Sequence, residues 1–296
     1  MRYKVKHQTT YEYQSAVSLC HNIVFQYPIT DSFQKVDSYK CNIFPEPNFL
    51  IERKDFFENR YLYFSVQKSH KKLVVESISE ITINTPMWLS LNPSATAPWE
   101  SVVQGLKSTD TLNDIRQFYL ESAFVIFWKD IRNYALQSFT PNRPIMEAML
   151  DLNTRIYQDF TFTPGFTDIS TPLEDVFRDK KGVCQDYAHF TLACLRSIGL
   201  AARYMSGYIE TIPPPGKPKL EGSDASHAWI SLYIPESGWV EFDPTNNLLV
   251  NDQHIRVATG RDFSDIIPLK GIVYSGGGQE MVVKVDVSRV TNESTV

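Results

Sequence analysis

The sequence predicts an α+β protein in two parts. An all-β, sandwich-like domain is expected over residues 1–95, and a domain in which a helix packs on an antiparallel sheet over residues 96–296. Three observations predict this division. Apolar and polar residues alternate along much of the first part, helical spacing dominates from about residue 112 to 198, and alternation returns after residue 200. A chain of 296 residues also has room for about two domains.

The first part is typical of strands separated by turns. Residues 3–13 alternate, and residues 73–83 give the clearest period-two pattern. Turn-forming residues lie at 45–48 and at Glu58-Asn59. Residues 92–98, Asn-Pro-Ser-Ala-Thr-Ala-Pro, are the expected linker to the second part.

The second part opens with helical patterns, which we interpret as scaffold over residues 112–139 and 144–157. A further pattern begins at Cys184 and ends before Gly199, which can supply the C-terminal cap. Strand patterns follow over residues 200–209, after Asp224, after Gly238, and over residues 281–287.

Cys184 stands at the predicted start of its helix. Backbone N–H groups without partners and the positive end of the helix dipole favour a thiolate at such a position, and the same N–H groups can hold an oxyanion. A lone cysteine is as often a buried core residue. Two later segments favour the functional interpretation, because they supply His227 and Asp243 in the chain order Cys, His, Asp.

The loop between the two late strands decides whether this histidine and this aspartate can meet. A five-residue loop over residues 234–238 pairs Tyr233 with Trp239. Asp243 then lies opposite Trp229 and diagonal to His227, about 7–8 Å away in the backbone, which side chains can bridge. A four-residue loop would put the two side chains on opposite faces.

Four motifs carry a family resemblance. They are Gly-Val-Cys-Gln-Asp-Tyr-Ala-His at 182–189, Arg-Tyr-Met-Ser-Gly-Tyr at 203–208, Asp-Ala-Ser-His-Ala-Trp at 224–229 and Asp-Pro-Thr-Asn at 243–246. With these motifs the chain resembles the transglutaminase-like superfamily, in its bacterial cysteine-protease-like branch. The resemblance implies a papain/transglutaminase-like core with catalytic residues Cys184, His227 and Asp243. Residues 1–95 resemble the N-terminal module of such proteins, which often has Phe-Gly-Asn where this chain has Phe57-Glu58-Asn59.

Other polar residues receive structural interpretations. Asp224 is expected to be a turn or structural acceptor, with a third catalytic member as the alternative; Asp186 and His189 are expected either to be structural or to hydrogen-bond the reacting residues from behind. Arg261, with Asp262 or Asp265, is expected to form a buried ion-pair network under the site.

The surroundings of the reacting groups are less determined. Trp229 and Trp239 are expected to be pocket walls or plain core. The second oxyanion donor is unassigned, with residues 160–162 as a guess. The proline-rich loop at 213–218 borders the cleft in sequence, and we hypothesise that it acts as a lid.

Composition excludes several classes of function. Lys plus Arg total 29 against 34 Asp plus Glu, and no basic run interleaved with aromatic residues occurs, so no nucleic-acid partner is expected. No apolar run approaches the ~18 residues of a membrane span, and no apolar signal region follows the N-terminus. Four scattered cysteines without a Cys-x-x-Cys fit a reducing cytoplasm, and neither His-Glu-x-x-His nor an EF-hand loop is present, so no metal or other cofactor is expected.

The sequence therefore leaves three functional hypotheses in order. The first is hydrolysis of a peptide or isopeptide bond in a protein or peptide substrate through a thioester acyl-enzyme. The second is transfer of the same acyl group to an amine. The third is a binding module on an enzyme fold that has lost its activity.

Overall fold

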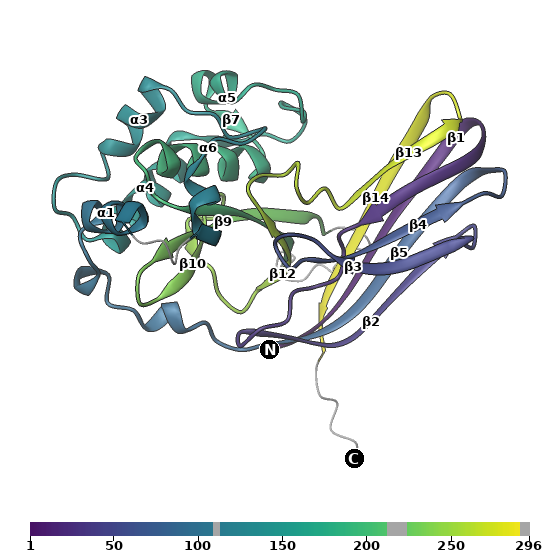
Figure 1. Cartoon of the computed structure of the whole chain (residues 1–296), viewed down its shortest axis with the longest axis horizontal. Helices are drawn as coiled ribbons and strands as arrows, with labels where there is room; N and C mark the ends of the chain where they lie inside the picture. The colour runs from purple at the N-terminus through teal and green to yellow at the C-terminus, as the bar shows by residue number, and fades with distance from the viewer. Residues whose placement is uncertain (109–112, 212–223, 291–296) are drawn as a thin grey trace, which may run out of the picture.

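The computed structural model describes residues 1–108, 113–211 and 224–290, and it contains two antiparallel sheets and a group of helices packed on one of them (Figure 1). This confirms the predicted α+β class. The loop at 213–218 and its lid role lie outside the described residues. Within the described ranges no helix is long and apolar enough to cross a membrane.

The first sheet is curled around its longest strand, β1. Its order is β2-β5-β1-β4-β3, with β13 and β14 also paired to β1. The first half of β1 pairs with β5 and β14, its second half with β4 and β13, and the register to β5 shifts between Glu12 and Val17. Apolar side chains from both halves form one core between them. The strands are β1 (Arg2–Val24), β2 (Gln34–Phe44), β3 (Phe49–Lys54), β4 (Arg60–Val66), β5 (His70–Ile83), β13 (Leu269–Ser275) and β14 (Gln279–Arg289).

The pairing of β13 and β14 with β1 corrects the predicted division at residue 95. The alternation over residues 281–287 does form a strand, but that strand returns to the first sheet rather than to the second (Figure 1). Alternation predicts that a segment forms a half-buried strand, but it does not predict which strand will pair with it. The division was wrong for residues 269–289 for this reason. The two parts also share a core, since Tyr3, Ile81 and Val287 of the first sheet belong to the same apolar cluster as the helices.

The second sheet has the order β11-β10-β9-β8-β12 and is antiparallel throughout. Helix α6 packs on β8 and β9, against Ala202, Tyr204 and Ile230, which point to the helical side of the sheet. Residues between these in sequence, such as Arg203, therefore point to the other side. The strands are β8 (Ala202–Ile209), β9 (Ser226–Ile234), β10 (Gly238–Asp243), β11 (Leu248–Leu249) and β12 (His254–Gly260).

The helices surround α6 and cover its outer side (Figure 1). The predicted helices over 144–157 and 184–198 are confirmed, with shifts at their ends. The elements are short 3-10 turns at Met87–Ser90, Pro93–Ala95 and Gln117–Tyr119, helices α1 (Trp99–Ser108), α2 (Asn113–Arg116), α3 (Lys129–Leu136), α4 (Ile145–Asp159), α5 (Leu173–Asp179) and α6 (Cys184–Ser197), and the two-residue strands β6 (Thr161–Phe162) and β7 (Lys181–Gly182).

The predicted single helix over 112–139 is wrong. Leu112 lies outside the described residues, α2 ends at Arg116, the 3-10 turn at Gln117–Tyr119 follows, and the chain is then extended or turned until α3 begins at Lys129. In this gap the N–H of Phe124 donates to Asp262 Oδ2 at 2.9 Å. A contact with a residue so distant in sequence satisfies the backbone without a helix, and helical periodicity cannot reveal it.

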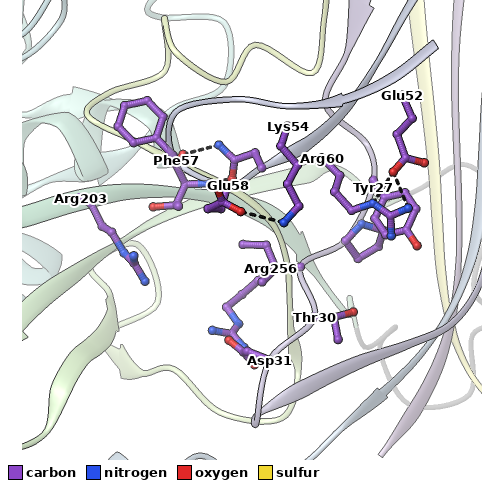
Figure 2. Close-up of a pocket in the computed structure, with 14 residues that line it drawn as sticks. Tyr27, Thr30, Asp31, Glu52, Lys54, Phe57, Glu58, Arg60, Arg203 and Arg256 are labelled. Atoms are coloured by element: carbon purple, nitrogen blue, oxygen red, sulfur yellow. Dashed lines mark hydrogen bonds and ion pairs between the residues drawn. The ribbon is translucent and has the colours of Figure 1, made fainter. Parts of the chain in front are cut away.

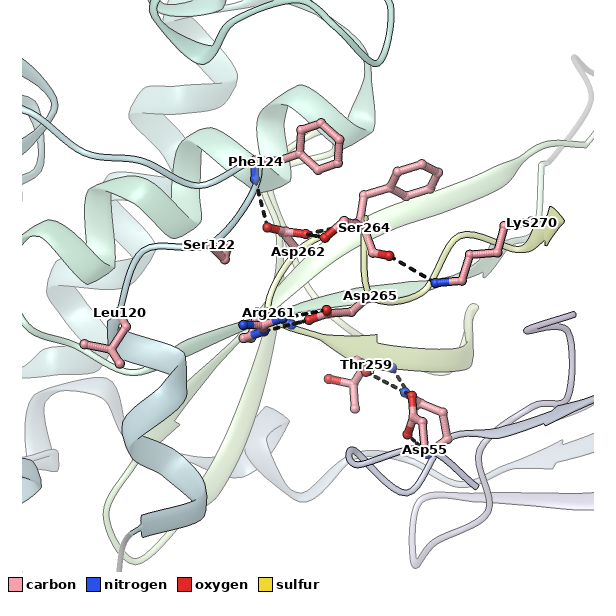
Figure 3. Close-up of polar contacts among 12 residues, drawn as sticks. Asp55, Leu120, Ser122, Phe124, Thr259, Arg261, Asp262, Ser264, Asp265 and Lys270 are labelled. Atoms are coloured by element: carbon pink, nitrogen blue, oxygen red, sulfur yellow. Dashed lines mark hydrogen bonds and ion pairs between the residues drawn. The ribbon is translucent and has the colours of Figure 1, made fainter. Parts of the chain in front are cut away.

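The turn between β3 and β4 fastens the first sheet to the second. Glu58 has a φ of 66°, the left-handed conformation that favours glycine, and its carboxylate pairs with Lys54 (Figure 2). The side chain of Asn59 donates to Thr259 O at 2.7 Å, accepts from Thr259 N at 2.8 Å and also reaches Asp55; Thr259 and Asp55 are labelled in Figure 3. The departure from Phe-Gly-Asn therefore lies at a position where the backbone itself selects for glycine.

Candidate active site

Cys184 is the first residue of α6 and is half-buried. The turn ahead of it is held by Asp186, whose Oδ2 accepts from Val183 N and from Thr167 Oγ1, each at 2.7 Å. A Cβ on Gly182 would lie 2.5 Å from that oxygen, so the close approach requires glycine. Burial raises the pKa of Asp186. The predicted supporting role of Asp186 is thus visible in its contacts.

The strand before α6 brings residues 160–162 close to the cysteine. Thr161 and Phe162 in β6 pair in parallel with Lys181 and Gly182 in β7, directly ahead of Cys184. Residues 161–162 therefore lie beside the two residues that precede Val183 and Cys184, and the N–H of Thr161 is already donated to Lys180 O. The role of residues 160–162 as the second oxyanion donor stays a prediction.

His227 and Asp243 meet through the predicted register. Trp239 pairs with Tyr233, which puts both side chains on the same face of β9 and β10. His227 Nε2 lies 2.7 Å from Asp243 Oδ2, the histidine is 8% exposed and the aspartate is fully buried. Since Nε2 is engaged with the carboxylate, Nδ1 is the ring atom left for the hydrogen bond between His227 and Cys184.

The electrostatics of this group favour an imidazolium. Burial alone lowers the pKa of His227, but the Asp243 carboxylate and the hydrogen bond to Cys184 outweigh it and raise the pKa to about 10. Burial alone raises the pKa of Asp243, yet the charge and hydrogen bond of His227, with a smaller part from His254, hold it well below its ordinary value. The carboxylate stays ionised and stabilises a proton on the imidazole.

Two further residues hold Asp243, and sequence reasoning missed both. His254 Nε2 lies 3.1 Å from Asp243 Oδ2, and the Asn246 amide donates to the same oxygen at 2.7 Å. Oδ1 accepts the backbone N–H groups of Thr245 and Asn246 at 3.0 and 3.2 Å. Asn246 belongs to the Asp-Pro-Thr-Asn motif, three residues after the carboxylate, so its position was a usable signal. His254 comes from β12 and opens the segment 254–265, which also resembles a family motif, but no feature of the sequence pairs it with Asp243.

The two histidines and the aspartate present ligand atoms within 4.8 Å of one another, a set that can hold a metal ion. The separations of 2.7 and 3.1 Å between these atoms are hydrogen-bond distances. The arrangement therefore suits a shared proton network, and the same atoms would have to separate to ligate a metal.

A second polar chain runs along the same face. Trp229 is fully buried and donates to Glu241 Oε2 at 2.8 Å, so it is core rather than an open pocket wall. Glu241 Oε1 pairs with Arg256 at 3.2 Å, and Arg256 pairs with Asp31 of the first sheet's loop at 2.6 Å. The indole ring lies 5.3 Å from His254 and 5.9 Å from His227. Trp239 is only half-buried and packs on Tyr233 and on Phe118.

The remaining predicted polar residues are structural. Asp224 accepts from Thr211 N at 3.3 Å and from Val287 N at 2.7 Å, which ties the second sheet to β14 and removes Asp224 as a third catalytic member. His189 Nε2 accepts from Phe263 N at 3.2 Å, and burial lowers the pKa of His189 to about 4. Its neutral ring supports α6, as expected.

The predicted buried network around Arg261 is only partly correct. Arg261 pairs with Asp265 at 2.9 Å, but its side chain is 44% exposed (Figure 3). The buried cation in this region is Arg196, which donates to Ala202 O and to Ser122 Oγ. Because Arg196 is buried, its hydrogen bonds hold this region together, whereas the exposed pair of Arg261 and Asp265 contributes little to stability.

A cavity of about 220 Å³ lies beside the first turn of α6. It is lined by Gln185, Asp186 and His189 on the helix and by segments 123–126 and 168–173 on the other side. Gln185, the residue after Cys184, lines this cavity, whereas Cys184 is not among its lining residues.

Comparisons with known proteins agree with this geometry. A family model of the bacterial transglutaminase-like N-terminal region matches residues 3–82, and a model of the transglutaminase-like superfamily matches residues 133–244. The second match includes all three of Cys184, His227 and Asp243.

Individual relatives extend the likeness to the whole chain. An uncharacterized protein of Mycobacterium tuberculosis is 37% identical over 296 residues, covering 97% of this chain and 92% of that protein. A protein-glutamine gamma-glutamyltransferase of Pseudomonas aeruginosa is 32% identical over 87 residues, which is 29% of this chain and 13% of that protein. The crystal structure of a candidate cysteine protease from Cytophaga hutchinsonii has a TM-score of 0.77 at 20% identity, covering 100% of this chain and 92% of that one, a likeness of fold.

Proposed function

The chain belongs to the transglutaminase-like superfamily, and on that premise we propose that it is a cysteine-dependent hydrolase of peptide or isopeptide bonds in a protein or peptide substrate. Cys184 is the nucleophile, His227 the general base and acid, and Asp243 the residue that orients the imidazole. The observation that carries the proposal is the His227 ring, which is held by a buried carboxylate at 2.7 Å and lies near enough to Cys184 for the thiol to raise the pKa of His227.

The first half of the reaction forms a thioester. The Cys184 sulfur attacks the carbonyl carbon of the amide, and the negative charge that develops on oxygen is held by backbone N–H groups at the start of α6. His227 gives its proton to the leaving nitrogen as the C–N bond breaks. The released amine departs and the acyl group stays on sulfur.

The second half regenerates the thiol. His227, now neutral, takes a proton from water while the water oxygen attacks the thioester carbon. The C–S bond breaks, the carboxylic acid leaves and the sulfur returns to its partnership with the imidazolium. Throughout, Asp243 stabilises the cation without accepting its proton, in line with the strongly depressed pKa of Asp243.

Alkylation by iodoacetamide tests the activated thiol. In the wild-type protein Cys184 should be labelled at about pH 6, where ordinary thiols react slowly. His227→Ala should remove this reaction. Uniform slow labelling of every accessible cysteine, unchanged by His227→Ala, would support the third hypothesis, a binding module on the same fold.

Acyl transfer to an amine is the second candidate, favoured by the local similarity to the gamma-glutamyltransferase of Pseudomonas aeruginosa. The two reactions share the thioester and differ in whether water or an amine attacks it. Incubating a peptide library with and without a primary amine separates them, because transfer yields amine-tagged peptides and hydrolysis yields new carboxyl ends. Cys184→Ala should abolish either product.

A further inference from the structure

A cavity of about 710 Å³ lies between the two sheets, on the side of the second sheet that faces away from α6 (Figure 2). We name it the intersheet cavity. The first sheet contributes residues 27–31 and 52–60, and the second contributes Arg203 from β8 and Arg256 and Thr259 from β12. A cavity of this volume is within the usual range for small-molecule sites. None of the proposed reacting groups lines it.

The cations of the intersheet cavity differ in whether a carboxylate neutralises them. Lys54 pairs with Glu58 at 2.7 Å, Arg60 with Glu52 at 2.6 Å, and Arg256 with both Asp31 and Glu241. Arg203 differs from these three cations, because no carboxylate of the described residues pairs with it.

Arg203 has no hydrogen bond or ion pair with any residue in the described ranges. Its guanidinium lies 4.3 Å from the ring of Trp239, and its Nε is buried without a partner. The Nε of Arg256, a buried residue at the same cavity, is also without one. Figure 2 shows the Arg256 guanidinium beside Asp31 and no contact drawn to Arg203. A buried donor without an acceptor costs about 1–3 kcal/mol, so an acceptor bound to the Arg203 guanidinium would be stabilised.

The acceptor should carry charge. Burial lowers the pKa of Arg203, but the nearby Glu241 carboxylate opposes this, so the pKa falls only to about 10 and the guanidinium remains charged at neutral pH. Its planar fork matches the two oxygens of a carboxylate. A phosphate dianion fits less well, because Asp31 and Glu241 already bring negative charge to Arg256. Tyr27, Ile29 and Phe57 supply apolar surface on the first-sheet side.

We propose that the intersheet cavity binds a small carboxylate, with its oxygens on Arg203 and its hydrocarbon part against the apolar lining of the first sheet. The site is independent of the proposed chemistry at Cys184, and its test requires no turnover.

The test is calorimetric titration of the full chain with 3-phenylpropionate, with the neutral 3-phenylpropionamide and with inorganic phosphate. The carboxylate should bind saturably and more tightly than either of the others. Arg203→Gln should weaken it by about thirtyfold or more, the effect of removing one partner of a buried charge pair. Arg203→Lys, which keeps the charge and loses the fork, should fall between wild type and Arg203→Gln.

Arg60→Gln is the matched control. Arg60 lines the same cavity but is neutralised by Glu52, so its loss should change the affinity by less than about threefold. No saturable binding up to about 10 mM would overturn the proposal and leave water as the occupant. Equal binding of the amide, tighter binding of phosphate, or an unchanged affinity in both Arg203 variants would overturn it as well. If Arg203→Gln fails to fold, Arg203→Lys and the ligand series still decide.

Discussion

Replacing Asp243 by asparagine tests the site most directly, because the change keeps the shape of the side chain and removes its charge. Oδ2 of Asp243 now accepts from His227 Nε2, His254 Nε2 and the Asn246 amide, while Oδ1 accepts two backbone N–H groups. Asparagine has only one side-chain oxygen, so only one of the two acceptor positions of Asp243 is kept. The other position is taken by an NH₂ group, which is a donor. This NH₂ group must then face ring nitrogens that were donors.

The consequence falls on the tautomer of His227. To accept from the new NH₂ group, Nε2 must give up its hydrogen, and the proton moves to Nδ1, the atom facing Cys184. An imidazole in that state cannot take the thiol proton. We expect labelling of Cys184 by iodoacetamide at about pH 6 to fall by up to about 300-fold, because an ordinary thiol of pKa about 8.5 is only about 1/300 thiolate at that pH.

The same substitution should also show a pH-dependent loss of stability. Folding raises the pKa of His227 from 6.5 to about 10, which corresponds to a stabilisation of the folded state by roughly 5 kcal/mol as an upper limit. Cys184 supplies part of this stabilisation. Because the folded pKa of His227 is raised, this stabilisation is complete below about 6.5 and is lost as the pH rises to about 10. Asp243 adds stability that is present above its unfolded value and lost as the pH falls towards its depressed pKa. The variant should therefore be less stable by about 3–5 kcal/mol near pH 6, and by less near pH 9.5.

Urea unfolding followed by tryptophan fluorescence at the two pH values measures this difference. Asp224→Asn is the control, since Asp224 is also a buried carboxylate and accepts the backbone N–H groups of Thr211 and Val287. It should cost stability and leave the labelling of Cys184 unchanged. The reasoning fails if Asp243→Asn labels within about threefold of wild type, or if its loss of stability is the same at both pH values.

Three further substitutions or measurements follow from the structure. Glu58→Gly should be more stable than Glu58→Ala by about 1 kcal/mol in urea unfolding, because both remove the exposed pair with Lys54 and only glycine relieves the left-handed backbone; equal stabilities would contradict this. His254→Phe removes one donor competing for Asp243, so the imidazolium of His227 should be held more tightly and the upper limb of the labelling profile should move to higher pH; a downward shift would be the contrary result. Peptide mapping after brief alkylation should find Cys184 modified and Cys194 untouched, because Cys194 is fully buried and burial raises its pKa far above the ordinary value; labelling of Cys194 in the folded protein would refute the packing of α6.

The meeting of His227 and Asp243 was predictable because a loop length fixes a register. Five residues between the strands pair Tyr233 with Trp239, and the parity of the numbering then decides the face of every side chain. The start of α6 at Cys184 was predictable for a similar reason, since glycine ahead of the helix and at its end delimits a local pattern.

What could not be predicted depends on contacts between distant segments. His254 reaches Asp243 only because β12 lies beyond β8 in the sheet, an order that no local pattern encodes. The break in the predicted helix over 112–139 depends on Asp262, and the placement of residues 269–289 depends on which edges of β1 are open. Propensity and periodicity describe a single segment, whereas these three features depend on which other segments it contacts.

The pairing of β1 with β13 and β14 has a consequence for how the protein is made. β1 leaves the ribosome long before two of its four neighbours, β13 and β14, which are translated only after residue 268. Until they arrive, both halves of β1 present an open edge to other nascent chains, the situation that promotes strand exchange and aggregation. A fragment that stops before residue 269 keeps those edges open for good, and one that starts at residue 96 carries β13 and β14 without the strand they complete.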